Sequence, residues 1–187
     1  MIIITGMPGS GKDEFVRVAV AMGFRDAHMG NTVKKYAIKD GVSMTDNAIG
    51  AYATEARKTY GMDIWARRTA ADIKFPGCTI VDGLRNEEEL NYFKKTFKCI
   101  IVIAVFANET DRLDRIIKRD REDDANNYDD IQRRDNRELS WGIGRVISLA
   151  DYMIVNDSSL DVYRKNAKLL LEDILKKHPE INLDSCQ

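Results

Sequence analysis

A glycine-rich loop between an apolar run and a helical pattern restricts the folds available to this chain. The run is Ile2–Thr5, the helical pattern covers Asp13–Met22, and the loop consists of Gly6, Met7, Pro8, Gly9, Ser10, Gly11, Lys12 and Asp13. Glycines permit positive φ and close backbone approach, so successive N–H groups turn inward and form an anion nest. The helix N-terminus adds partial positive charge, and Lys12 can reach the β- and γ-phosphates of a nucleotide. We therefore expect an ATP site here, with a tight turn and a chance lysine as the structural alternative.

Short apolar runs and helical patterns alternate along the chain. The runs Ile2–Thr5, Thr79–Asp82, Ile100–Phe106 and Tyr152–Val155 are rich in β-branched residues and do not alternate with polar ones, and Phe24–Met29 is a weaker fifth candidate. Such runs suit parallel strands that are buried on both faces. Helical patterns also cover Asn31–Lys39, Asp46–Tyr60, Asp63–Lys74, Asn86–Phe97, Glu109–Arg119, Asp130–Leu149 and Ser159–Lys177. The alternation predicts an α/β P-loop NTPase fold with a five-stranded parallel sheet flanked by helices.

Length and composition are those of an ordinary soluble globular protein. The chain has 187 residues, 44% apolar and 32% charged, with a net charge of −1. The charge gives no support to nucleic acid or membrane binding, and no apolar run approaches the roughly 20 residues of a membrane span. The N-terminus also lacks the basic leader of a signal peptide. Three cysteines, Cys78, Cys99 and Cys186, show no metal-binding spacing. We interpret Cys78 and Cys99 as small buried groups at strand starts, and expect a reducing, cytoplasmic location.

No linker divides the chain, so we expect one domain over residues 1–178. Within it, a loop or mobile lid is expected over 119–137, because the stretch Asp120–Asp130 is polar and lacks a hydrophobic face. Residues 179–187, after Pro179, are expected to form a frayed tail.

The residue after Lys12 departs from the usual phosphate-loop pattern. Ser or Thr is expected there as a Mg²⁺ ligand, whereas Asp13 and Glu14 follow in this chain. A carboxylate in the first turn of a helix is favoured by the helix dipole, by about 0.3–1 kcal/mol. Facing a polyphosphate it repels, unless a cation lies between them. We therefore predict an unusually strong Mg²⁺ dependence of ATP binding; the alternative is that both carboxylates point into solvent.

The phosphate loop together with Val81-Asp82-Gly83-Leu84-Arg85 resembles adenylate-kinase-type nucleotide kinases. Three later segments resemble, more specifically, an archaeal family of adenylate-kinase-related, dephospho-CoA-kinase-like proteins, over the chain to about residue 177. These segments are Arg121–Asp124, Trp141–Gly144 and Ala150–Asn156. The resemblance implies a nucleoside-monophosphate-kinase-like architecture, with an acceptor-binding helical segment over 30–75 and the lid over 119–137.

The same resemblance assigns an acceptor site and a metal site. Adenylate kinases clamp the acceptor with a Gly-Asp-hydrophobic-hydrophobic-Arg segment, where this chain has Gly30, Asn31 and Lys34, so bidentate phosphate binding becomes point-charge binding. A solvated face carrying Lys34 and its neighbour is the alternative. Asp82 is expected to hold Mg²⁺, and Arg85 to bind an acceptor phosphate or the transition-state charge. Adenylate kinases have one more residue before this arginine, and a helix-capping Asp82 beside a surface Arg85 is the alternative.

Arginines recur around the expected lid and could gather near the γ-phosphate on closure. The lid set is Arg115, Arg119, Arg121, Arg134 and Arg137, and the catalytic set is Lys12, Asp82, Arg85 and Arg119. Between Asp111 and Glu138, eight basic residues face ten acidic ones, unlike a nucleic-acid-binding stripe. Exposed helix ion pairs are the structural alternative for each arginine.

These patterns favour an ATP- and Mg²⁺-dependent phosphotransferase acting on a small phosphorylated acceptor, a nucleoside monophosphate such as AMP first. A dephospho-CoA-type kinase, a slow ATP-hydrolysing switch or assembly factor, and an inactive nucleotide sensor are the alternatives. The expected partner is a nucleotide, with no membrane and no nucleic acid, and the sequence leaves the oligomeric state open. Neither histidine is expected to be catalytic, since His28 stands alone at a strand end and His178 lies near the tail.

Overall fold

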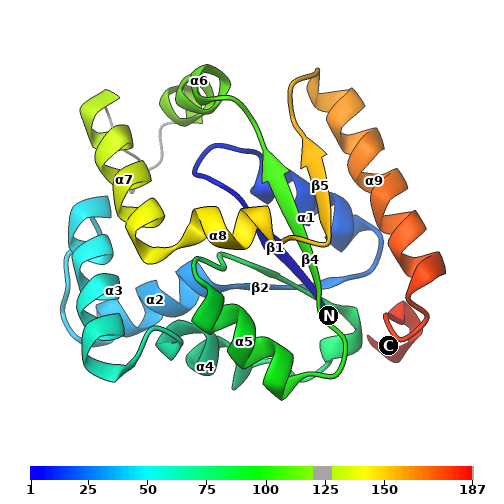
Figure 1. Cartoon of the computed structure of the whole chain (residues 1–187), viewed down its shortest axis with the longest axis horizontal. Helices are drawn as coiled ribbons and strands as arrows, with labels where there is room; N and C mark the ends of the chain where they lie inside the picture. The colour runs from blue at the N-terminus through cyan, green and yellow to red at the C-terminus, as the bar shows by residue number, and fades with distance from the viewer. Residues whose placement is uncertain (120–127, 187) are drawn as a thin grey trace.

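The computed structural model contains a parallel sheet with helices on both faces (Figure 1). It describes residues 1–119 and 128–186. The strand order is β2-β3-β1-β4-β5, and every neighbouring pair is parallel. The strands are β1 (Ile2–Thr5), β2 (Arg25–His28), β3 (Thr79–Asp82), β4 (Ile101–Phe106) and β5 (Tyr152–Val155). The predicted fold class is confirmed.

The helices connect these strands as crossovers. They are α1 (Lys12–Ala21), α2 (Met29–Lys39), α3 (Asp46–Tyr60), α4 (Ile64–Ala70), α5 (Glu87–Thr96), α6 (Glu109–Arg119), α7 (Tyr128–Trp141), α8 (Ile143–Ser148) and α9 (Leu160–Lys177), with short 3₁₀ turns at Pro76–Cys78 and Leu183–Cys186. No helix among the described residues is long and apolar enough to cross a membrane.

The central strand β1 shows why the sheet is covered on both faces. All four of its residues are buried, and successive side chains point to opposite sides. Ile3 joins a core that α2–α5 and α8 cover, where Trp65 and Phe93 are buried. Ile2 and Ile4 join the other core, beneath α1 and α9. The carboxyl ends of all five strands therefore meet at one edge of the sheet, beneath the loops that follow them.

Two helical predictions differ from the structure. The pattern over Asp130–Leu149 is not one helix, because Gly142 has a φ of 107° and separates α7 from α8. The helix predicted over Asp63–Lys74 is shorter, Ile64–Ala70. The weak fifth strand is present as β2; its first two residues, Arg25 and Asp26, are exposed because β2 lies at the sheet edge. The division into acceptor and lid segments stays a prediction.

Two expectations for the tail and the cysteines do not hold. The sequence predicts a frayed tail after Pro179, but Ile181 is only 2% exposed and packs in the α1–α9 core. The N–H of Asn182 also donates to the carbonyl of Gly77 over 3.1 Å. Cys78 is buried, as expected, but it is disulfide-bonded and so is not the reduced thiol that the sequence suggested. Cys99 is a half-buried free thiol.

Candidate phosphate-binding pocket

The loop after β1 takes a conformation that requires glycine. Gly9 has a φ of 77° and Gly11 a φ of 108°. A Cβ on Gly9 would lie 2.6 Å from the Arg112 carbonyl oxygen, and one on Gly11 would collide with the amide of Asn156. Side chains are excluded at both positions, by strain and by contact.

Groups from other elements hold this loop in place. The guanidinium of Arg112 (α6) donates to the Pro8 carbonyl over 2.9 Å and forms a bidentate pair with Asp135 of α7. At the end of β5, the Asn156 amide donates to the Ser10 carbonyl over 2.9 Å, and the Tyr163 hydroxyl donates to the Gly11 carbonyl over 3.1 Å. These contacts fix the conformation of the loop.

The side chain of Lys12 folds back against the phosphate loop. Its ammonium donates to the carbonyls of Gly6 (2.7 Å) and Met7 (3.0 Å), and the residue is 7% exposed. Burial lowers the pKa of Lys12 to about 8, although the nearby Asp82 carboxylate opposes the shift. A bound phosphate would stabilise the charged form of the ammonium and so raise this pKa again.

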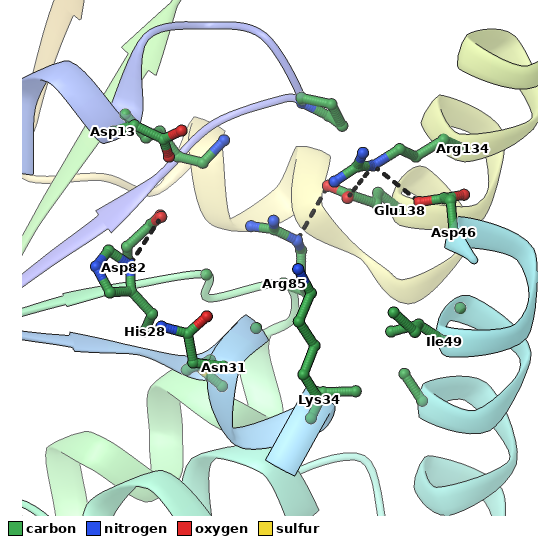
Figure 2. Close-up of a pocket in the computed structure, with 18 of the residues that line it drawn as sticks. Asp13, His28, Asn31, Lys34, Asp46, Ile49, Asp82, Arg85, Arg134 and Glu138 are labelled. Atoms are coloured by element: carbon green, nitrogen blue, oxygen red, sulfur yellow. Dashed lines mark ion pairs between the residues drawn. The ribbon is translucent and has the colours of Figure 1, made fainter. Parts of the chain in front are cut away.

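A pocket of about 460 Å³ opens beside the loop, where the ends of β2 and β3 meet α2, α3 and α7 (Figure 2). Eight lysine and arginine side chains and five carboxylates line it, so its chemistry suits an anionic ligand. Most of the predicted site residues lie here: Pro8, Gly9, Gly11, Lys12, Asp13, Gly30, Lys34, Asp82, Arg85, Arg115, Arg134 and Arg137. The side chain of Arg119, and all of Arg121, lie outside the described residues.

The two carboxylates after Lys12 both line the pocket, and Glu14 is held by two arginines. Glu14 pairs with Arg17 over 2.7 Å and with Arg164 of α9 over 2.6 Å. Burial alone would raise the pKa of Glu14, but hydrogen bonds from Arg164 and Arg17 lower it. Glu14 is therefore engaged in ion pairs and does not simply point into solvent.

Asp82 offers an oxygen that suits a cation. It ends β3, is 9% exposed, and its Oδ1 is buried without a hydrogen-bond partner. A buried, unpartnered carboxylate oxygen is costly, and hard carboxylate oxygens are the ligands that Mg²⁺ prefers. Asp82 and Asp13 therefore fit the magnesium ion that the sequence predicts beside the phosphates.

The other oxygen of Asp82 faces His28. In the parallel pairing of β2 with β3, His28 lies opposite Asp82, and its Nδ1 is 3.6 Å from Asp82 Oδ2. Its Nε2 is 3.0 Å from Asp26 Oδ2. The pKa of His28 is raised, first by the neighbouring Asp82 carboxylate and against the effect of burial. The expectation that His28 stands alone is wrong.

Several of the predicted arginines lie together in the pocket, and three of them form ion pairs with carboxylates there. Arg85 Nε lies 3.0 Å from Glu138 Oε2, and Arg134 lies 3.6 Å from the other oxygen of Glu138 (Figure 2). Asp46, the first residue of α3, pairs with Arg134 over 3.4 Å and with Arg137 over 2.7 Å. Burial raises the pKa of Glu138, but the charges of Arg85 and Arg134 outweigh it and hold the pKa below its usual value. These ion pairs join α3 to α7 across the pocket.

Comparison with known proteins places the chain in a family. A family model described as an AAA domain matches residues 2–138. The UPF0200 protein of Thermoplasma volcanium is 57% identical over 176 residues, which cover 94% of this chain and 98% of that protein. The UPF0200 protein of Methanosarcina acetivorans is 38% identical over 183 residues, 96% of this chain and 98% of that one.

The chain belongs to the UPF0200 family. Solved structures share the fold of this UPF0200 protein at low sequence identity. A shikimate kinase from Acinetobacter baumannii has a TM-score of 0.60 at 14% identity, with 95% of this chain and 93% of that chain covered. A dephospho-CoA kinase from Campylobacter jejuni has a TM-score of 0.57 at 16% identity, with 94% and 97% covered. The expected resemblance holds for the archaeal family and for a kinase-like P-loop fold.

Sequence reasoning missed three residues of the UPF0200 pocket: His28, Asp46 and Glu138. His28 ends the strand beside the one that the predicted Asp82 ends, and this signal could have brought the two together once β2 was placed beside β3. Glu138 and Asp46 carry no such signal, because they lie 92 positions apart in the sequence on different helices, and their shared partner Arg134 brings them together only through tertiary packing.

Proposed function

We propose that this UPF0200 protein transfers the γ-phosphoryl group of ATP to a small acceptor. The observation that carries the proposal is the convergence of Lys12, Asp82 and Arg85 on one pocket beside the phosphate loop. Lys12 begins α1 after the loop that follows β1, whereas Asp82 ends β3 and Arg85 lies in the loop after it. Their chemistry suits a reaction that needs positioning and charge stabilisation and little covalent chemistry.

The roles follow from where each group lies. The loop N–H groups and Lys12 would hold the β- and γ-phosphates, and Asp82 with Asp13 would hold Mg²⁺, which neutralises charge between the phosphates. Arg85 lies across the pocket, where it would meet the moving phosphoryl group. The half-buried pairs between α3 and α7 would limit the access of water from that side of the pocket, which would strengthen the electrostatic effects inside it.

The first acceptor that we propose is a phosphorylated one, a nucleoside monophosphate such as AMP. Gly30, Lys34 and Arg85 border the part of the pocket beyond Asp82 and are the proposed acceptor-binding residues. A phosphate oxygen is already ionised, so this reaction requires no general base. It does require that Arg85 exchange Glu138 for the acceptor phosphate.

The pairing of Asp82 with His28 favours a second candidate, a hydroxyl acceptor such as dephospho-CoA. A hydroxyl group must lose its proton during attack, and Asp82 is a carboxylate oriented by an adjacent imidazole. In this alternative Arg85 can stay paired with Glu138, because no acceptor phosphate needs it at the reacting end.

A coupled assay of ADP release tests the proposal against a panel of nucleoside monophosphates and dephospho-CoA. Acceptor-stimulated release that is lost in Lys12→Ala supports a kinase. Arg85→Ala should then abolish activity if the acceptor is a phosphate. If the acceptor is a hydroxyl group, His28→Ala should reduce activity more strongly than Arg85→Ala does. Hydrolysis that no acceptor stimulates would instead indicate a switch, and ATP binding without turnover would indicate a sensor; either result contradicts the proposed transferase.

A further inference from the structure

A cysteine, a histidine and a glutamate meet far from the phosphate pocket, at the amino ends of the strands. Cys99 precedes β4, His178 follows the last turn of α9, and Glu180 lies two residues further. Figure 1 shows both chain ends in this region, opposite the loops that carry the phosphate site. The sequence spacing of the cysteines gives no sign of this cluster, because Cys99 lies 79 positions before His178 and 81 before Glu180.

The three side chains present their ligand atoms to one point. Cys99 Sγ lies 3.3 Å from Glu180 Oε1, and His178 Nδ1 lies 3.8 Å from the same oxygen. All three ligand atoms are within 4.8 Å of one another. In tetrahedral zinc sites, bond lengths of about 2.0–2.3 Å place neighbouring ligand atoms about 3.3–3.6 Å apart. The two measured separations therefore match such a site to within about 0.5 Å.

The histidine is oriented for this role from its other side. Its Nε2 lies 3.5 Å from the hydroxyl of Tyr152 on β5, while Nδ1 faces Glu180. Metal-binding histidines characteristically engage the second ring nitrogen with an outer partner, which fixes the tautomer and the ring orientation. Tyr152 is placed to do this for His178.

The charges around Cys99 favour a cation. The Cys99 thiol donates a hydrogen bond to Glu180. A divalent ion bound between the two groups would take the place of that proton and stabilise the thiolate directly. The α-amino group of Met1 donates to the Cys99 carbonyl over 2.8 Å and so holds the backbone at this position.

We propose that Cys99, His178 and Glu180 bind one zinc ion, or another divalent transition-metal ion of similar softness, and leave one position to solvent. A thiolate and an imidazole select zinc or cobalt over Mg²⁺ and Ca²⁺. The ion links the chain after α9 to the start of β4. Because the next residue, Ile181, is buried against the same core, metal binding stabilises the docking of the C-terminal segment.

The test uses the full chain with the Cys78 disulfide intact, freed of metal with a chelator and titrated with Co²⁺. We expect one equivalent to bind and to produce a thiolate-to-cobalt charge-transfer absorption together with the visible bands of tetrahedral cobalt, and Zn²⁺ to displace it. Cys99→Ser should lose the charge-transfer absorption, and His178→Gln and Glu180→Gln should each weaken binding. Glu172→Gln, which alters an exposed carboxylate of α9, is the matched control and should bind as the parent does.

Thermal melting followed by circular dichroism separates metal binding from misfolding. Zn²⁺ should raise the melting temperature of the parent and of Glu172→Gln, and should leave that of Cys99→Ser unchanged. The proposal is overturned if the parent shows no cobalt–thiolate absorption in excess metal. It is also overturned if folded Cys99→Ser retains that absorption, or if folded His178→Gln binds cobalt as tightly as the parent.

Discussion

At the scale of single residues, Lys12 links nucleotide binding to pH. Burial lowers the pKa of its ammonium to about 8, and a bound phosphate favours the charged form, so binding raises this pKa. Below pH 8 the lysine is already charged and contributes no pH dependence. Above pH 8 ATP binding must take up a proton, and we expect the Kd to rise by about tenfold per pH unit. Calorimetric titrations between pH 7 and about 9.5 measure this slope.

The variant Lys12→Ala is the control for this titration. It removes the titrating group, so the weaker binding that remains should be flat over the same pH range. A parent protein whose ATP affinity does not change above pH 8 would contradict the assignment of Lys12 to the phosphates.

Some site residues could be predicted from their position next to a strand, whereas others depend on contacts between elements far apart in the sequence. Asp82 ends a strand, and Lys12 and Arg85 lie within seven residues after one; parallel strands bring their carboxyl ends to one edge of the sheet. Glu138 and Asp46 become neighbours only through the packing of α7 on α3. The sequence therefore predicted the cations of the pocket but not the carboxylates that neutralise them.

At the scale of elements, the start of α5 depends on one buried cap. Asn86 is fully buried; its side chain accepts from the N–H of Glu89 over 2.7 Å and donates to the Met62 carbonyl over 3.1 Å. Asn86→Ala removes both bonds, and we expect it to lower the free energy of unfolding by about 2–3 kcal/mol. Urea unfolding measures the loss. Ser159→Ala removes the exposed and longer cap of α9 (3.4 Å), so its cost should be only about 0.5–1 kcal/mol. Equal losses in the two variants would contradict the role of burial.

Two helical glycines should respond differently to alanine. Gly144 in α8 has room for a Cβ, 3.7 Å from Leu139, so Gly144→Ala should stabilise the protein by about 0.5–1 kcal/mol. In α3, a Cβ on Gly50 would collide with the guanidinium of Arg137 and displace it from Asp46. We expect the free energy of unfolding of Gly50→Ala, measured in urea, to be about 1–2 kcal/mol lower than that of Gly144→Ala. A gain in Gly50→Ala equal to that in Gly144→Ala would show that the Arg137 contact carries no stability.

The ends of a helix could be predicted where a capping residue precedes it and a glycine follows it. The helix predicted over Asp46–Tyr60 has the observed bounds because Thr45 caps its start and Gly61 ends it. The pattern over Asp130–Leu149 kept its apolar period through Gly142, so only the backbone of the folded chain shows that this glycine divides it.

At the scale of the whole molecule, the sequence predicted the strands but not their order. Four strands were recognisable from their apolar runs and β2 only weakly, whereas the arrangement β2-β3-β1-β4-β5 depends on how the whole chain packs. That order places β3 between β2 and β1, and so brings His28 to Asp82 and both of them to the phosphate loop. The pocket is therefore a consequence of topology as much as of motif.

Because ATP would contact the phosphate loop and the end of β3 together, its binding should stabilise the whole fold. This stabilisation should depend on Mg²⁺. At a concentration of 100 times its Kd, ATP with Mg²⁺ is expected to add about 2.7 kcal/mol, or roughly 5–11 °C in melting temperature for a chain of this size. Without Mg²⁺ the carboxylates of Asp13 and Asp82 face the phosphates uncompensated, so most of the shift at the same ATP concentration should disappear. Asp13→Asn removes one of these charges and should keep more of its shift without the metal. Equal melting shifts with and without Mg²⁺ in the parent would show that these carboxylates do not meet the phosphates.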